Sequence, residues 1–295
     1  MSRIDEAFRQ TNKLRGPHIE RSEHAVQVVD SSVLDAFVRD TETPVDVIHR
    51  QARIPSRRPQ VRKTAASLTF DRSYDGKVVV GREITATCVE QFRRVAASLH
   101  DCQQQHGTKT LMVSSAVPRE GKTLTASNVA LTLSESFRRR VLLMDADLRR
   151  PSIQHVFGFS DGRGLGDVLA SGEGSLPLHE VSPCLSVLTA GRPDSSPVAH
   201  LASDSMRTVI ADAAAQFEWV VIDAPPVGAL PDARLIANLV DAILFVIDVS
   251  TTPYELVQRA IEELGPDRII GTVLNRAAAE TLPHHYDSYY PGASK

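Results

Sequence analysis

The sequence predicts an α/β protein built on a doubly wound, mainly parallel sheet, and two observations support this. Five short apolar runs, at residues 110–114, 141–144, 219–222, 242–247 and 269–274, alternate with segments of helical periodicity. Runs of this length without strict polar alternation are typical of parallel strands buried on both faces. A glycine- and lysine-containing segment directly follows the first run, as expected for a ligand-binding loop at the carboxyl end of a strand.

Helical periodicity lies on both sides of the first run. Before it, apolar side chains recur at i, i+3 and i+4 spacing and predict an amphipathic helix. These residues are Cys88, Val89, Phe92, Val95, Ala96 and Leu99. After it, a second amphipathic helix is predicted from residue 122 to about residue 137.

The first 80 residues differ in composition from the rest of the chain. Helices are possible at residues 5–14 and 32–39, and residues 49–63 are rich in arginine and proline. Such a composition favours a solvated linker, with contact to anionic lipid as the alternative. We therefore predict a partly disordered extension at residues 1–80, a domain at residues 82–276 and a flexible tail at residues 277–295.

The bulk composition excludes several classes of protein. Apolar residues make up 42% and charged residues 23% of the chain, which is ordinary for a globular protein. The net charge of -3 gives no reason to expect a nucleic-acid partner. No apolar run approaches the roughly 20 residues of a membrane span, and residues 1–10 do not form a secretory signal. The three cysteines have no metal-ligand spacing, so a reduced, cytoplasmic protein is expected.

The strongest motif is AVPREGKT at residues 116–123, which fits the P-loop pattern GxxxxGK[ST] except that Ala116 replaces the first glycine. Backbone N–H groups of such a loop surround phosphates, and the following helix directs its N-terminus at the anion. Lys122 is expected to reach the β and γ phosphates and the Thr123 hydroxyl to bind Mg²⁺. The residues expected to contact ATP here are Ala116, Arg119, Glu120, Gly121, Lys122, Thr123 and Leu124.

Carboxylates follow two of the other apolar runs. Asp145 and Asp147 come at the end of the run at residues 141–144, and Asp223 ends the run at residues 219–222. Carboxylates at strand ends beside a P-loop are placed to hold Mg²⁺ or to accept a proton. Arg149 and Arg150 follow the first pair, and guanidinium groups suit phosphate or carboxylate partners.

These motifs together resemble the bacterial tyrosine kinases of capsule and exopolysaccharide systems, a branch of the deviant P-loop ATPases related to the partition ATPases. The resemblance extends over roughly residues 82–290. It rests on SSAVPREGKT at residues 114–123, VLLMDADLRRPSIQHVFG at 141–158, GLGDVL at 164–169, VVIDAPPV at 220–227 and GTVLNR at 271–276. Partition ATPases have a second lysine early in the P-loop, and its absence here favours the kinase branch.

The resemblance implies specific roles for the site residues. Lys122, Asp145 and Asp147 would be catalytic, because in that family the second motif carries the catalytic and Mg²⁺-associated aspartates. Thr123, with Asp145 or Asp223, would hold Mg²⁺, and Asn275 would contact the nucleotide base. ATP and Mg²⁺ are the cofactors implied.

The family's substrate is its own C-terminal tyrosine cluster, and this chain ends in HHYDSYYPGASK. Three of its five tyrosines, Tyr286, Tyr289 and Tyr290, lie in this polar segment, where packing gives no reason for aromatic residues. We interpret them as phosphate acceptors, with a docking patch as the alternative.

Two positions depart from the family's pattern. Arg119 stands where members commonly have glycine, so the geometry of the phosphate loop or turnover is expected to differ. The oligomerisation pattern ExxRxxR begins with Glu90 and Arg93 but has Ala96 at its last position. Arg94 is displaced by about 200° from Ala96 around a helix and cannot substitute for it, which places ring assembly in doubt.

The sequence thus predicts an ATP-dependent protein-tyrosine autokinase that regulates exopolysaccharide or capsule polymerisation and export. The alternatives are a non-kinase nucleotide switch in the export complex and a partition-type positioning ATPase. The expected partners are a separate inner-membrane polysaccharide co-polymerase that activates the kinase, other copies of the chain that exchange tails in trans, and a tyrosine phosphatase. The expected location is the inner face of the plasma membrane, through a partner.

Overall fold

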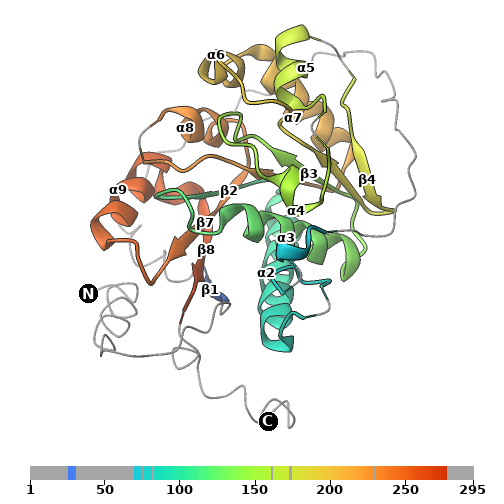
Figure 1. Ribbon diagram of the computed structural model, residues 1–295. Coiled ribbons are helices and arrows are strands. Elements are labelled where there is room, and N and C mark those ends of the chain that lie inside the picture. Colours follow the sequence, from blue (N-terminus) through green and yellow to red (C-terminus); the bar gives the residue numbers. More distant parts are fainter. Residues whose placement is uncertain are drawn as a thin grey trace.

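The computed structural model describes residues 26–30 and 70–277, except residues 75, 82, 161, 173, 174 and 229. In this part of the chain, eight strands form one sheet in the order β1-β8-β7-β2-β6-β3-β5-β4 (Figure 1). The strands from β8 to β5 run parallel, and β1 and β4 are antiparallel edges. The parallel strands are β8 (Ile269–Asn275), β7 (Ala242–Asp248), β2 (Thr110–Ser115), β6 (Trp219–Asp223), β3 (Val141–Asp145) and β5 (Leu185–Leu188).

The five apolar runs are confirmed as β2, β3, β6, β7 and β8. Their side chains alternate between two cores, one on each face of the sheet. Leu111 and Val113 belong to one core, whereas Met112 between them belongs to the other. Because both faces are covered, these strands need apolar residues at every position, which explains the continuous runs in the sequence.

Helices cover both faces of the sheet, and the two helices expected around the first run are confirmed. On one face, α2 (Ala86–His106), α3 (Lys122–Glu135) and the short α4 (Ile153–Val156) contribute to one core. Thr85 caps α2 through its side chain, and Gly107 ends the helix in the left-handed conformation. The other core includes α5 (Leu165–Ser171), α6 (Pro197–Leu201), α7 (Asp204–Gln216), α8 (Asp232–Ala237) and α9 (Tyr254–Leu264).

The edge strands were not among the elements expected from the sequence. β1 (Val26–Asp30) pairs with β8 from Val26 opposite Asn275 to Asp30 opposite Gly271, and β4 (His179–Ser182) pairs with β5. Both are short, so their apolar pattern is too brief to identify a strand. The helices expected at residues 5–14 and 32–39, the basic linker and the tyrosine tail lie outside the described residues.

The GLGDVL segment packs tightly on the loop that follows β5. The amides of Leu165 and Gly166 donate to the carbonyls of Thr189 and Ala190 at 2.8 and 2.9 Å. A Cβ atom at Gly164 would lie 2.1 Å from the amide nitrogen of Gly191, so only glycine allows this approach of two backbones.

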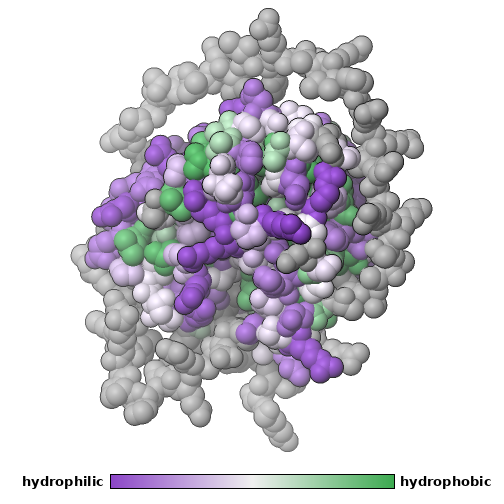
Figure 2. Space-filling view, turned by 45° about the horizontal axis from the view of Figure 1, so that its top comes forward, coloured by the Kyte–Doolittle hydropathy of each residue, from purple (hydrophilic) through white to green (hydrophobic). Residues whose placement is uncertain are grey.

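The surface of the described part is mainly hydrophilic on the face shown in Figure 2, where hydrophobic residues form small, separate groups. The exposed large hydrophobic residues in this part are Val80, Val198, Leu230 and Leu256. In the described residues, no helix combines the length and the apolar character that crossing a membrane requires.

Candidate functional site

The phosphate-loop segment connects β2 to α3. β2 ends at Ser115 and α3 begins at Lys122, so residues 116–121 form the loop. Gly121 has φ of 94°, and a Cβ atom there would lie 2.2 Å from the side-chain nitrogen of Asn275. The motif therefore requires glycine at this position for two reasons, the left-handed backbone and the contact with β8.

Arg119 also has a left-handed backbone, with φ of 70°, and its side chain is exposed. The loop thus keeps at this position a conformation that glycine adopts freely and that an L-residue adopts at a cost of roughly 1–2 kcal/mol. The departure at this position changes the side chain but retains a glycine-like backbone.

The Glu120 side chain is buried and bonded to the protein. Its carboxylate accepts hydrogen bonds from the amides of Val117 at 2.7 Å and Asp248 at 3.1 Å, and from the Thr252 hydroxyl at 2.5 Å. These donors leave the backbone N–H of Glu120, not its carboxylate, for contact with a phosphate.

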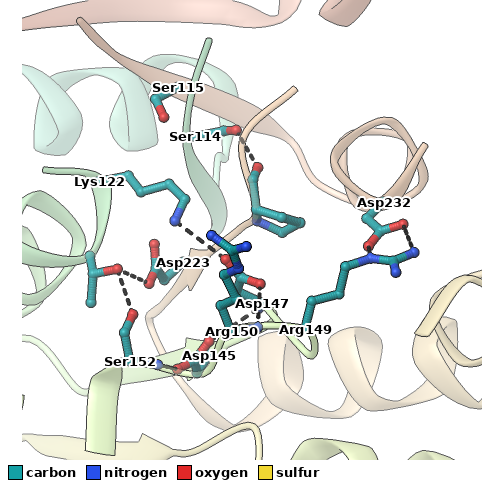
Figure 3. Close-up of polar contacts among 12 residues, drawn as sticks. Ser114, Ser115, Lys122, Asp145, Asp147, Arg149, Arg150, Ser152, Asp223 and Asp232 are labelled. Carbon is teal, nitrogen blue, oxygen red and sulfur yellow. Dashed lines mark hydrogen bonds and ion pairs between the residues drawn. The ribbon is translucent and has the colours of Figure 1, made fainter. Parts of the chain in front are cut away.

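The carboxyl ends of β3 and β6 bring the predicted acidic residues beside the start of α3 (Figure 3). Asp145 and Asp223 are paired neighbours on these strands. The Lys122 ammonium lies 3.4 Å from Asp147 Oδ2. The Thr123 hydroxyl donates to Asp223 Oδ2 at 2.6 Å and lies 2.8 Å from the Ser152 hydroxyl. The structure thus brings together the lysine, the threonine and the three aspartates chosen from the sequence.

Asp145 organises the loop that follows β3. One carboxylate oxygen accepts from the amide of Asp147 at 3.1 Å, and the other accepts from the amides of Ser152 and Ile153 at 2.9 and 3.0 Å. Burial raises the pKa of Asp145 to about 6, and these hydrogen bonds act in the opposite direction. Both oxygens are therefore occupied by backbone donors.

Asp223 differs because its Oδ1 atom is buried without a hydrogen-bond partner. Burial raises the pKa of this carboxyl to about 7, although the nearby Lys122 charge lowers it. A buried oxygen without a partner beside the Thr123 hydroxyl fits a cation ligand better than the occupied oxygens of Asp145 do. Within the described ranges, no group of three or more His, Cys, Asp or Glu side chains is arranged to hold a metal. Mg²⁺ takes one or two protein carboxylates and completes its shell with phosphate oxygens and water, so the Asp223 and Thr123 oxygens fit this ion.

The two arginines after Asp147 extend in different directions (Figure 3). Arg149 donates to both oxygens of Asp232 on α8, at 2.6 and 3.3 Å, and Asp232 is buried. Arg150 extends to the same side as Lys122, and its amide donates to Asp147 Oδ1 at 3.0 Å. Arg149 thus binds a carboxylate of the protein, whereas the Arg150 side chain is exposed.

Asn275 ends β8 and lies against the phosphate loop rather than apart from it. Its side-chain nitrogen donates to the carbonyl of Glu120 at 2.8 Å. The remaining predicted residues of the loop, Ala116 and Leu124, flank it at the end of β2 and in the first turn of α3.

Two further predictions have different outcomes. Tyr286, Tyr289 and Tyr290 lie outside the described residues. In α2, Glu90 and Arg93 form an ion pair at 3.6 Å, and Ala96 is fully buried in the core. The last position of the ExxRxxR pattern therefore faces inward in this chain.

Sequence reasoning missed Ser152, Asp232, Asp248 and Thr252, which contact the predicted site residues. Asp248 ends β7 at the same edge of the sheet as Asp145 and Asp223, so its position at a strand end was an available signal. Asp232 and Thr252 carry no such signal, because their partners are distant in the sequence.

Comparison with known proteins supports the resemblance. Tyrosine-protein kinase YwqD of Bacillus subtilis is 30% identical over 207 residues, covering 69% of this chain and 86% of that protein. Succinoglycan biosynthesis transport protein ExoP of Rhizobium meliloti is 31% identical over 227 residues, covering 70% of this chain but 28% of its own length. No protein-family model matches the chain.

The fold agrees with that of a solved kinase. The kinase domain of the Escherichia coli tyrosine kinase ETK superposes with a TM-score of 0.61 at 28% identity, covering 65% of this chain and 78% of that one. The phosphate loop, the strand-end aspartates, the sequence identity to YwqD and this superposition show that the chain belongs to the bacterial tyrosine-protein kinase family.

Proposed function

We propose that this chain is an ATP-dependent protein-tyrosine autokinase that regulates exopolysaccharide or capsule polymerisation and export. The observation that carries the proposal is the 3.4 Å approach of Lys122 to Asp147 beside the Thr123–Asp223 hydrogen bond. Lys122, the Asp147 carboxylate and the Thr123–Asp223 pair thus share one edge of the sheet. The names of YwqD, a tyrosine-protein kinase, and ExoP, a succinoglycan biosynthesis transport protein, support the biological setting.

The phosphate loop would bind the polyphosphate of ATP. Backbone N–H groups of Arg119, Glu120 and Gly121 and the N-terminus of α3 would supply fixed dipoles for the anion, since Pro118 has no N–H and the Val117 N–H donates to Glu120. Lys122 is buried, and it would exchange its contact with Asp147 for the β and γ phosphates, stabilising the charge on the transferring phosphoryl group.

Thr123 and Asp223 would hold Mg²⁺, since their oxygens lie 2.6 Å apart and Asp223 has an unpartnered oxygen. When bound, the metal ion neutralises charge on the β and γ phosphates. Asp223 must lose its proton to serve as a ligand, and its raised pKa therefore couples this role to pH.

Asp147 would orient or deprotonate the acceptor tyrosine. Once Lys122 turns to the phosphates, Asp147 Oδ2 becomes available, whereas both oxygens of Asp145 accept backbone donors. Asp145 would act instead by fixing the loop that carries Asp147. A base within hydrogen-bond reach of the hydroxyl contributes about 10²–10⁴-fold in rate.

The acceptors would be Tyr286, Tyr289 and Tyr290, delivered in trans from the tail of a neighbouring copy. Each phosphate would add nearly two negative charges to the tail, a change that can alter assembly. A separate inner-membrane polysaccharide co-polymerase would activate the kinase and hold it at the inner face of the plasma membrane, and a tyrosine phosphatase would reverse the reaction.

Mass spectrometry of the purified full chain, incubated with Mg²⁺–ATP, tests this proposal against a Lys122→Met control. Phosphate on Tyr286, Tyr289 or Tyr290 in the wild type alone is the expected result. ATP hydrolysis with an unmodified tail, even with a membrane activator fragment present, would instead favour a nucleotide switch.

A further inference from the structure

The phosphate loop is joined to the root of the C-terminal tail, Arg276 and Ala277, by a set of contacts that run through Asp248 and Asn275. The set begins at Glu120, whose buried carboxylate accepts from the amide of Asp248 at 3.1 Å. Asp248 ends β7, and the paired strand β8 ends beside it at Asn275. The loop before α3 is therefore anchored on the last residues of these two strands.

Asn275 makes three contacts that fix its position. Its side-chain nitrogen donates to the carbonyl of Glu120 at 2.8 Å, and its side-chain oxygen accepts from the amide of Arg276 at 2.9 Å. Its carbonyl accepts from the amide of Val249 at 3.2 Å. Gly121 packs so closely against this side chain that an added Cβ atom would lie 2.2 Å from its nitrogen. Because the contact is so close, movement of the loop toward β8 would displace the Asn275 side chain.

Arg276 is the next residue, and its backbone is left-handed with φ of 56°. For an L-residue this conformation costs roughly 1–2 kcal/mol and persists where surrounding contacts enforce it. Here the guanidinium forms an ion pair with the buried carboxylate of Asp248. Asp248 therefore bonds to the phosphate loop through its amide and to the root of the tail through its side chain.

The root continues into Ala277, which is buried, and the acceptor tyrosines begin at Tyr286, ten residues after Arg276. A segment of ten residues spans at most about 35 Å. Holding Arg276 in one conformation reduces the number of conformations open to this segment. Less conformational entropy is then lost when a tyrosine enters an active site.

We propose that Arg276 is a positioning residue, which sets the direction of the tyrosine tail through Asp248 and transmits to it the state of the phosphate loop through Glu120 and Asn275. This inference rests on the proposed autokinase function, since it concerns presentation of the same tail. It predicts that nucleotide in the loop orders the root of the tail, and that loss of the ion pair impairs the tail as a substrate without impairing the active site.

The test compares the full chain with Arg276→Ala, Arg276→Lys and the control Arg268→Ala, at an arginine near the opposite end of β8 that donates to Ala237. Each is incubated with Mg²⁺–ATP while tail phosphorylation, phosphorylation of a glutamate–tyrosine copolymer and ATP hydrolysis are followed. For Arg276→Ala we expect tail phosphorylation to fall about tenfold and the other two rates to stay within about twofold. Arg276→Lys should restore part of the tail rate, and Arg268→Ala should match the wild type.

Hydrogen exchange of the same variants, with and without ADP, tests the coupling independently of kinase activity. ADP should slow exchange in the peptide that contains residues 275–277 in the wild type but not in Arg276→Ala. Equal tail phosphorylation in Arg276→Ala and wild type, or ADP protection confined to residues 116–123, would overturn the inference. Absence of phosphorylation from both tail and copolymer in the wild type would instead contradict the proposed function, and the exchange result would still decide the coupling.

Discussion

The Thr123 hydroxyl donates a 2.6 Å hydrogen bond to Asp223, which lies 100 residues further along the chain. This bond ties the first turn of α3 to the end of β6 and places a potential metal-binding hydroxyl against a carboxylate with one unpartnered oxygen. Asp223 is fully buried and Thr123 partly so, and the protonation state of this buried carboxyl therefore matters for metal binding.

Asp223 should make Mg²⁺-dependent nucleotide binding sensitive to pH. Because its pKa is raised from 3.8 to about 7 by burial, it must release a proton to ligate the metal, so affinity should fall up to about tenfold per pH unit below pH 7. Titration calorimetry with Mg²⁺–ADP at pH 6 and pH 8 measures this. In Asp223→Asn the affinity should be low at both pH values, and an unchanged pH dependence in that variant would assign the titration to another group.

The same carboxyl should make the nucleotide-free protein less stable as pH rises. Between pH 3.8 and about 7 the folded state retains a proton that the unfolded state has released, so the free energy of unfolding decreases through this window and levels above it. Asp145, with its pKa raised to about 6, acts in the same direction. Chemical unfolding of wild type and Asp223→Asn across this range should show a shallower decrease in the variant; identical slopes would contradict the assignment.

Gly121→Ala should abolish nucleotide binding and destabilise the fold. The left-handed backbone costs an L-residue roughly 1–2 kcal/mol, and the added Cβ, 2.2 Å from Asn275, adds a clash. Gly107→Ala is the matched control, since Gly107 has φ of 70° but no atom within 4 Å of the added Cβ. The control should lose about 1–2 kcal/mol and bind nucleotide normally. Equal stability losses in the two variants, measured by denaturant unfolding, would show that the contact with Asn275 is unimportant.

Asp145→Asn and Asp147→Asn should separate loop organisation from catalysis. The Asp145 variant turns an amide N–H₂ toward a backbone N–H, and it should lose about 1–3 kcal/mol of unfolding free energy. The Asp147 variant should be closer to wild type in stability but slower in tyrosine phosphorylation by about 100-fold or more. Unfolding curves and single-turnover phosphorylation rates provide the comparison, and the reverse pattern would exchange the two roles.

The ion pair between Arg149 and Asp232 should couple the loop after β3 to α8. Arg149→Ala leaves the buried Asp232 carboxylate without its partner, which should cost about 1–3 kcal/mol, with the lower part of this range expected because the Arg149 side chain is 34% exposed and its removal admits water. The double variant Arg149→Ala/Asp232→Asn should recover part of this loss. Thermal unfolding of Arg149→Ala, Asp232→Asn and the double variant gives the coupling energy between the two side chains. Strictly additive losses would mean that this energy is zero and would contradict the coupling.

The central strands and the chemistry of the site could be predicted from the sequence because both depend on short, local patterns. Strands buried on both faces leave unbroken apolar runs, and the phosphate loop needs a fixed glycine and lysine just before and at the start of a helix. Asp145 and Asp223 were recognisable because each ends such a run. Edge strands β1 and β4 carry too short a pattern, and β1 lies within residues 1–80, for which the sequence predicts a partly disordered extension.

By itself, the sequence determined which residue types stand at the strand ends. Lys122 and Thr123 follow the loop after β2, and β3, β6 and β8 end in Asp145, Asp223 and Asn275. Only the tertiary structure decided which hydrogen-bond partners each of these side chains has, and therefore which role it can take. The backbone donors around Asp145, the unpartnered oxygen of Asp223 and the shared anchor at Asp248 arise between residues far apart in the chain. Hydrogen-bond partners and burial are set when strands and helices pack together, and a linear pattern does not contain that information.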